Sequence, residues 1–173
     1  MIIMNKEELV LKSLIEGEVI PQSGLFQINE YHLKMYLDQY HFLFGSSQKR
    51  CGKLGNIRFA RRLAGRTLLK VNFDRGARFN DIKAGLVYLI SNEAFPGFVK
   101  VGMTINIKQR LDVYQTYDPY RRFKIENYDF VLNRLSKEKE FLTHPDIYNE
   151  SGEWVSVENS IEIFQRLISY IPS

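Results

Sequence analysis

The sequence predicts an α+β protein, with a small three-stranded antiparallel sheet flanked by helices and a mainly helical, basic N-terminal segment. Residues 85–110 read as strand, turn, strand and helix, because an apolar run is followed by a Pro-Gly turn, an alternating run and helically spaced apolar residues. Residues 1–80 instead combine apolar residues at helical spacing with a block of positive charge. We therefore expect a basic segment at 1–80, an α+β domain at 84–156 and a C-terminal helix packing on that domain at 157–173.

Two N-terminal helices have clear sequence signals. Residues 5–16 predict a helix that begins with a capping box formed by Asn5 and Glu8 and ends at Gly17. Residues 29–44 predict a second helix with a stripe of aromatic residues and leucines. We interpret this stripe as core packing rather than as a base-stacking surface, because its spacing is that of a buried helix face.

A basic block follows these helices. From Lys49 to Arg78 there are ten Lys or Arg residues and one acid, Asp74, which gives +9 (10 minus 1) in a chain whose net charge is +4. Its middle, residues 57–64, fits a helix or a strand, and we favour the helix, whereas residues 67–73 are more strand-like. Such a block usually faces a polyanion, the alternative being a solvated surface without a partner. With a smaller cluster at 121–124, it predicts DNA contacts by Lys49, Arg50, Lys53, Arg58, Arg61, Arg62, Arg66, Arg121 and Arg122.

The second half of the chain supplies the predicted sheet. In order, we expect a strand at 85–90, a turn at 92–97, a strand at 98–101, a helix capped by Thr104 or Asn106, a strand at 123–132, a helix capped by Ser136, a loop at 149–152 and an amphipathic helix from 157.

Composition limits the class of protein. Of 173 residues, 45 % are hydrophobic and 25 % charged, as in ordinary globular proteins. No run approaches the ~18 apolar residues of a membrane span, and no signal-peptide pattern is present. We therefore expect no membrane partner and a cytoplasmic location, which is the host cytoplasm if a phage encodes the protein. A single cysteine, Cys51, excludes an intrachain disulfide, and the three histidines lack metal-ligand spacing.

A group of short motifs lies in the predicted sheet. Gly85, Val87 and Tyr88 are followed by Lys100-Val101-Gly102, and Arg110 comes eight residues after Gly102. This arrangement resembles the GIY-YIG nuclease family over roughly residues 85–154, in the phage and restriction-type branch that has lysine in the second half-motif. The resemblance implies a Mg²⁺-dependent (or Mn²⁺-dependent) endonuclease that hydrolyses phosphodiester bonds in DNA.

The side chains in these motifs suit that chemistry. Tyr88 is the candidate general base or water-positioning group, and because a phenol titrates near ~10 it needs help at neutral pH. Lys100 can favour the phenolate or lose its own proton. Arg110 would hold the scissile phosphate through its planar, permanent charge. Tyr114, one helical turn later, either contacts phosphate beside Arg110 or packs in the core.

A glutamate on a later helix completes the predicted site. The resemblance implies one metal-binding glutamate with large apolar residues three and four positions on. Glu138 meets this pattern with Phe141 and Leu142, whereas Glu140 does not, so we predict Glu138 as the metal ligand. A lone carboxylate leaves most of the coordination shell to water and phosphate, which suits Mg²⁺. The alternative is a solvated helix glutamate, and Asn149 is a weaker site match.

Three functions remain open at this point. The first is the endonuclease, whose phosphate contacts carry no sequence preference, and which needs a homodimer or sequential nicking to cut both strands. The second is a catalytically inactive nucleic-acid-binding protein on the same fold, since Met103 stands where family members often have a polar residue. The third is a protein–protein adaptor, whose binding would depend little on salt. The residues do not distinguish DNA from RNA.

Overall fold

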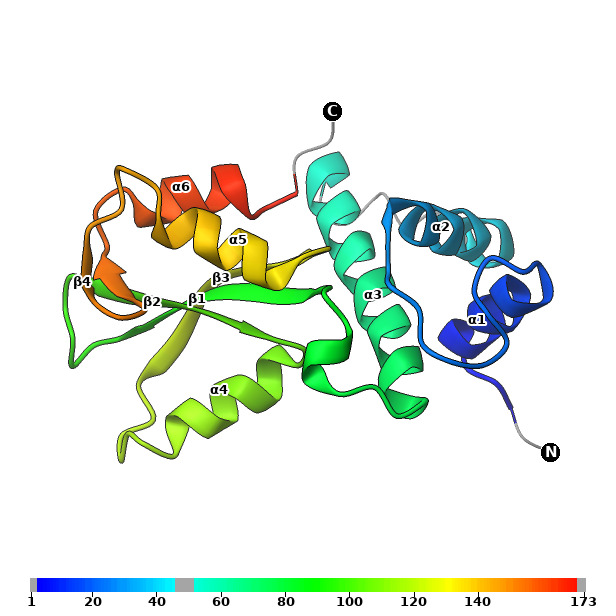
Figure 1. The fold of residues 1–173 in the computed structure, drawn as a ribbon, viewed down its shortest axis with the longest axis horizontal. Coiled ribbons are helices and arrows are strands. Elements are labelled where there is room, and N and C mark those ends of the chain that lie inside the picture. The colour runs from blue at the N-terminus through cyan, green and yellow to red at the C-terminus, as the bar shows by residue number, and fades with distance from the viewer. Residues whose placement is uncertain (1–2, 46–51, 171–173) are drawn as a thin grey trace. The chain divides into compact units, whose positions relative to one another are not determined.

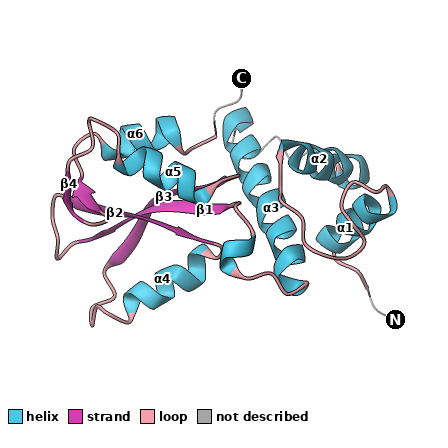
Figure 2. Ribbon diagram, in the orientation of Figure 1, coloured by secondary structure: helices cyan, strands magenta, loops and turns pink. Residues whose placement is uncertain are grey.

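The computed structural model describes residues 3–45 and 52–170 of the protein. The chain divides into two compact units, 1–84 and 85–173. The first unit contains helices and turns, and the second combines helices with a sheet, which confirms the predicted α+β class (Figure 1, Figure 2). Within the described ranges, no helix has the length and apolar character needed to cross a membrane.

The first unit confirms the two predicted N-terminal helices. Asn5 and Glu8 form the expected capping box at the start of α1, with the Glu8 amide donating to Asn5 Oδ1 at 2.8 Å and the Asn5 amide donating to Glu8 Oε2 at 2.9 Å. Leu33 and Tyr36 of the predicted stripe are buried, whereas Leu43 remains 41 % exposed. The elements of this unit are α1 (Lys6–Glu16), α2 (Glu30–Phe44), α3 (Gly52–Asp74) and a short 3₁₀ turn, η1 (Phe79–Asp81).

Helix α3 confirms the helical prediction for residues 57–64 and corrects the one for residues 67–73, which continue the helix. Ala64, Leu68 and Asn72 are fully buried at four-residue intervals, so this segment buries a helical face. The Asn72 side chain accepts a hydrogen bond from the Phe26 amide at 2.9 Å, which ties α3 to the loop between α1 and α2. Packing has therefore overridden a local sequence that resembles a strand.

The second unit contains an antiparallel sheet with strand order β3-β1-β2-β5-β4. Three long strands match the predicted ones, and two three-residue strands extend the sheet. Part of the predicted 149–152 loop is strand β4, which pairs with β5. The elements are β1 (Gly85–Asn92), β2 (Phe98–Thr104), α4 (Ile107–Gln115), β3 (Phe123–Val131), α5 (Arg134–Leu142), β4 (Asn149–Ser151), β5 (Trp154–Ser156) and α6 (Ser160–Leu167).

The helix boundaries of this unit refine the predictions. Asn106 rather than Thr104 caps α4, accepting from the Gln109 amide at 3.1 Å. The prediction of Ser136 as the cap of α5 is wrong, because Asn133 accepts from the Ser136 amide and starts the helix one turn earlier. Helix α6 begins at Ser160 and ends at Leu167, so it is shorter than the predicted helix.

The two faces of the sheet carry different side chains. Helices α5 and α6 cover one face and α4 lies on the other (Figure 1). Because strand side chains alternate between faces, Val87 and Val101 pack with Phe141 and Phe164 in the apolar core, while Tyr88 points to the α4 side. The apolar face holds the unit together and the α4 face presents polar groups.

The aromatic pair formed by α5 and α6 provides a test of this core. Phe141 and Phe164 are fully buried with ring centroids 5.9 Å apart. We expect Phe164→Ala to lower the free energy of unfolding by about 3–5 kcal/mol, because it leaves a cavity. Ile161→Ala, on the exposed side of α6, should cost about 1 kcal/mol or less. Urea unfolding followed by Trp154 fluorescence measures both variants, and equal losses would contradict this core.

Candidate active site

Tyr88 lies at the centre of the sheet, and its ring crosses the neighbouring strand. The residue is fully buried and its cross-strand partner in β2 is Gly102. A Cβ atom added at Gly102 would collide with the hydroxyl oxygen and Cζ of Tyr88. A glycine at this position is therefore required because the tyrosine ring occupies the space of its missing side chain.

Helix α4 supplies two groups to the Tyr88 hydroxyl. Arg110 Nε donates a hydrogen bond to it at 3.1 Å, and the Tyr114 hydroxyl lies 3.1 Å from the same oxygen. Arg110 and Tyr114 are one helical turn apart, so they project from the same face of α4. Arg110 is an exposed residue, and its guanidinium therefore links a buried phenol with solvent. Three of the predicted site residues thus meet at one atom.

The environment of Tyr88 disfavours the phenolate form of its side chain. Burial raises the pKa of the Tyr88 phenol well above its usual range, the hydrogen bond with Tyr114 raises it further, and Arg110 opposes the shift. Of the surrounding groups, Arg110 alone thus favours the phenolate that a general base would require.

Lys100 lies next to the cluster and pairs with an acid that sequence reasoning did not select. Its ammonium is 3.3 Å from Glu153 Oε2 and 5.6 Å from the centre of the Tyr114 ring. Glu153 precedes Trp154, the cross-strand partner of Lys100 in β5. The Glu153-Trp154 pair resembles an ending of phage-type members of the family, but the contact of Glu153 with Lys100 follows only from the pairing of β2 with β5.

Glu138 is also part of this neighbourhood. Its side chain is on α5 and the residue is only 8 % exposed. Burial raises the pKa of its carboxyl, the charge of Glu153 raises it further, and the charge of Lys100 lowers it. By contrast, Glu140 is exposed and pairs with Lys137 at 3.3 Å. The two glutamates considered as metal ligands thus differ in environment, since Glu138 is buried near Lys100 and Glu153 and Glu140 is exposed.

The described residues offer few ligands for a metal ion. Among the described residues, no group of three or more His, Cys, Asp or Glu side chains could hold a metal ion. The two carboxylates Glu138 and Glu153 offer oxygen ligands only, and Mg²⁺ is typically bound by one or two carboxylates with the remaining positions filled by water and phosphate. Asn149 instead donates to the Gly152 carbonyl at 2.6 Å and stabilises the β4–β5 turn.

The predicted DNA-binding residues are in different environments. Lys49 and Arg50 lie outside the described residues, and Lys53 falls in the first turn of α3. Arg61 is buried and donates to both carboxylate oxygens of Glu30 at 2.7 Å, an arrangement that joins α3 to α2. The other predicted contacts are exposed or half-buried: Arg58, Arg62 and Arg66 on α3, and Arg121 and Arg122 before β3.

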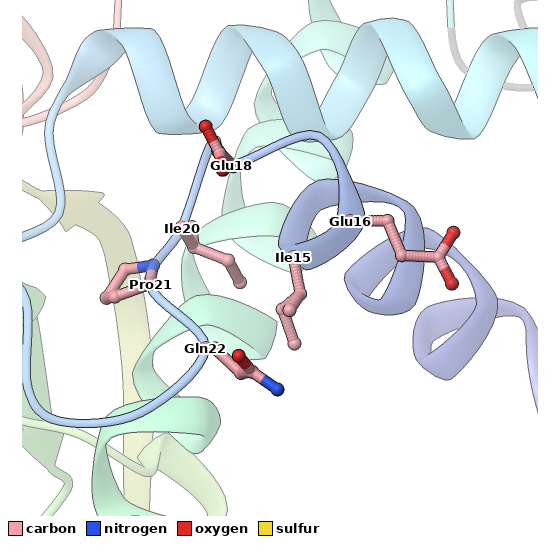
Figure 3. Close-up of a pocket in the computed structure, with 6 residues that line it drawn as sticks. All are labelled: Ile15, Glu16, Glu18, Ile20, Pro21 and Gln22. Carbon is pink, nitrogen blue, oxygen red and sulfur yellow. The ribbon is translucent and has the colours of Figure 1, made fainter.

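A cavity of about 440 Å³ lies in the first unit, between the end of α1 and the loop that follows it (Figure 3). Its lining includes Glu16 and Glu18, and none of the predicted site residues contributes to it. The polar cluster on the α4 face is therefore a separate feature.

Comparison with known proteins adds one finding. Residues 85–166 match the family model described as the T5orf172 domain, a stretch that runs from the first residue of β1 into α6. No curated protein and no solved structure matches the chain. The match coincides with the unit that contains the Tyr88 cluster.

The buried carboxyl of Glu138 predicts a dependence of stability on pH. Its pKa is raised in the folded state, so its contribution to stability is fully present below the unfolded pKa of ~4.3 and is lost as the pH rises through the folded value. Glu138→Gln cannot ionise and should therefore be more stable than the wild type at pH 7.

Thermal or urea unfolding at pH 4 and pH 7 measures this effect. The advantage of Glu138→Gln should shrink towards pH 4, whereas Glu140→Gln, at an exposed position, should show no such gain. A Glu138→Gln protein less stable than the wild type at pH 7 would refute the burial argument.

Proposed function

We propose that the second unit is a metal-dependent DNA endonuclease that hydrolyses phosphodiester bonds through a GIY-YIG-type site. The observation that carries this proposal is the convergence of Arg110 and Tyr114 on the Tyr88 hydroxyl, with Lys100 beside them. The match with the T5orf172 domain, which is nuclease-like, supports the same class.

Arg110 is the group that holds the scissile phosphate. Its Nε is engaged with Tyr88, which fixes the plane of the guanidinium and presents its terminal nitrogens from an exposed position. A guanidinium fixed in this way can donate to two phosphate oxygens and stabilise the charge that develops on them. Tyr114 contacts the same phosphate from one turn further along the helix.

Water is positioned by Tyr88 and deprotonated by Lys100. The Tyr88 phenol keeps its proton, so its hydroxyl serves as a hydrogen-bonding group for the attacking water. Lys100 is the neighbouring side chain that can take the proton, after its ammonium has separated from Glu153 and released a proton to solvent. The proton taken from the attacking water then restores the ammonium. In this mechanism the Lys100–Glu153 ion pair is the state before proton transfer.

Glu138 would hold the metal ion, with Glu153 as a second oxygen ligand. Bound Mg²⁺ or Mn²⁺ supplies positive charge for the non-bridging oxygens and the departing 3′ oxygen. Burial and, to a smaller extent, the charge of Glu153 raise the pKa of the Glu138 carboxyl, and a cation bound by both carboxylates would oppose that shift.

Basic residues outside the cluster would hold the DNA backbone. Contacts of Lys and Arg with phosphates give affinity that falls steeply with salt and carries no direct sequence information. Arg66 on α3 and Arg121 before β3 are exposed and suited to this role, whereas Arg61 is committed to Glu30. RNA has the same backbone charge, so the choice of DNA is part of the proposal.

A plasmid assay tests this function. We expect the wild type to nick supercoiled plasmid in Mg²⁺, and Glu138→Gln to reduce the rate by at least about 100-fold, because the metal site loses its buried carboxylate. Glu140→Gln is the matched control on the same helix and should stay within about threefold of the wild type. Cleavage that survives Glu138→Gln would remove the metal assignment.

A second candidate function is nucleic-acid binding without catalysis. Met103 favours it, because it stands at the position after Gly102 where a polar residue is common in the family. Salt-sensitive DNA binding without cleavage in Mg²⁺, Mn²⁺ or other divalent ions would establish this second function, whereas binding insensitive to salt would indicate a protein–protein adaptor.

The Lys100→Arg variant tests whether Lys100 acts as a proton acceptor or only as a positive charge. Arginine keeps the charge but cannot be deprotonated, so the rate of nicking should fall by about 10²–10⁴-fold while DNA affinity changes little. Lys108→Arg, at an exposed position of α4, should remain within about twofold. Full activity of Lys100→Arg would show that charge at this position is sufficient.

A further inference from the structure

The connection between α4 and β3 exposes two tyrosines. Tyr117 is 79 % exposed and Tyr120 is 77 % exposed, the highest values among the large apolar residues described in the second unit. Aromatic rings at such exposure contribute little to the core, so packing does not account for them. The turn that carries them lies at the end of the helix that supplies Arg110 and Tyr114.

This turn is held in one conformation by a buried carboxylate. Asp118 is 5 % exposed and accepts hydrogen bonds from the Tyr120 amide at 3.0 Å and from the Arg122 amide at 3.0 Å. It also accepts from Asn92 Nδ2 at 2.9 Å and from Arg122 Nε at 3.1 Å, and these contacts lower the pKa of its carboxyl. The two tyrosines are therefore displayed from a preorganised turn, which reduces the entropy lost on binding.

The turn is built directly onto the candidate active site. The Tyr117 amide donates to the Tyr114 carbonyl at 3.0 Å, and the Tyr114 ring lies 5.2 Å from that of Phe123 at the start of β3. Tyr117 follows Arg110 by seven residues, and α4 ends between them at Gln115, so the turn begins within two residues of the helix that carries Arg110. The turn is therefore adjacent to the site of a phosphate held by Arg110.

The charge around the turn complements a nucleic-acid strand. Residues 107–124 contain five Lys or Arg residues and two acids, which gives +3 (5 minus 2), and one of those acids, Asp118, is occupied inside the turn. Arg122 lies 5.0 Å from the centre of the Tyr120 ring, and Arg121 is exposed between them. Exposed aromatic rings interleaved with arginines form the kind of surface on which unpaired bases stack while their phosphates are neutralised.

We propose that Tyr117 and Tyr120 stack on unpaired DNA bases near the scissile phosphate. This inference rests on the proposed function for the location of that phosphate. Stacking needs an exposed base face, so the turn distinguishes unpaired or easily unstacked nucleotides from regular duplex. The turn would direct cleavage to junctions, gaps or bulges rather than to a base sequence.

Fluorescence of 2-aminopurine tests the stacking without requiring cleavage. In EDTA, wild-type protein should quench 2-aminopurine in single-stranded DNA, and Tyr117→Ala/Tyr120→Ala should abolish the quenching and weaken binding by roughly fivefold or more for each tyrosine. Tyr117→Phe/Tyr120→Phe should retain both, because phenylalanine keeps the ring. Tyr31→Ala, which removes a 56 % exposed tyrosine on α2, is the matched control and should behave as the wild type.

The outcomes separate this inference from the proposed function. Quenching that persists in the double alanine variant, or an equal loss of affinity for duplex and single-stranded DNA, would overturn the stacking role. Plasmid nicking without any quenching would overturn the stacking role alone. Tyrosine-dependent quenching without nicking in any divalent ion would support the turn and overturn the endonuclease. Circular dichroism melts of the variants should match the wild type.

Discussion

The contact between the Tyr88 ring and the backbone of Gly102 is the constraint from which the site follows. It exists because the β1–β2 register sets these residues opposite each other. A slip of one residue would reverse the faces of the strand and move the tyrosine into the apolar core. With the ring lying over the glycine, its hydroxyl emerges at α4, where Arg110 and Tyr114 bind it. The β1–β2 register therefore places the Tyr88 hydroxyl where the side chains of α4 can bind it.

The two faces of this sheet differ in the side chains that they bury. On the α5–α6 side the alternating valines and the phenylalanine pair bury apolar area, and this burial supports the fold. On the other side the phenol of Tyr88 is buried and the half-buried ammonium of Lys100 lies against Glu153, whereas the buried carboxyl of Glu138 belongs to α5, the helix over the apolar face. Each of these polar groups is less stable there than in water unless it is paired. A site with buried polar groups costs stability, which is the usual relation between activity and stability in proteins.

Local signals in the sequence predicted most of the fold, and contacts distant in sequence account for what it missed. Capping boxes, the Pro-Gly turn and the glycine stops depend on neighbours within a few residues, so α1, α2 and the first two strands were predicted correctly. Residues 67–73 resemble a strand, but their burial against the rest of the first unit makes them helical. The spacing of Tyr88, Lys100 and Arg110 identified the cluster, whereas Glu153 required the β2–β5 pairing and the Arg61–Glu30 pair required the packing of α3 on α2.

The distribution of contacts also limits what kind of selectivity this protein can have. In the proposed function Arg110 contacts a phosphate, and Tyr88 and Lys100 contact the attacking water, none of which differs between bases. The exposed Arg66 of α3 is suited to a further phosphate. Sequence readout requires hydrogen-bonding groups fixed against base edges, and the preorganised α4–β3 turn offers aromatic faces instead. An aromatic ring can stack on any base whose face is exposed, so such rings detect whether a base is unstacked and not which base it is. A nuclease built from these parts would therefore select its substrate by the local structure of the strand, and its affinity would come from charge.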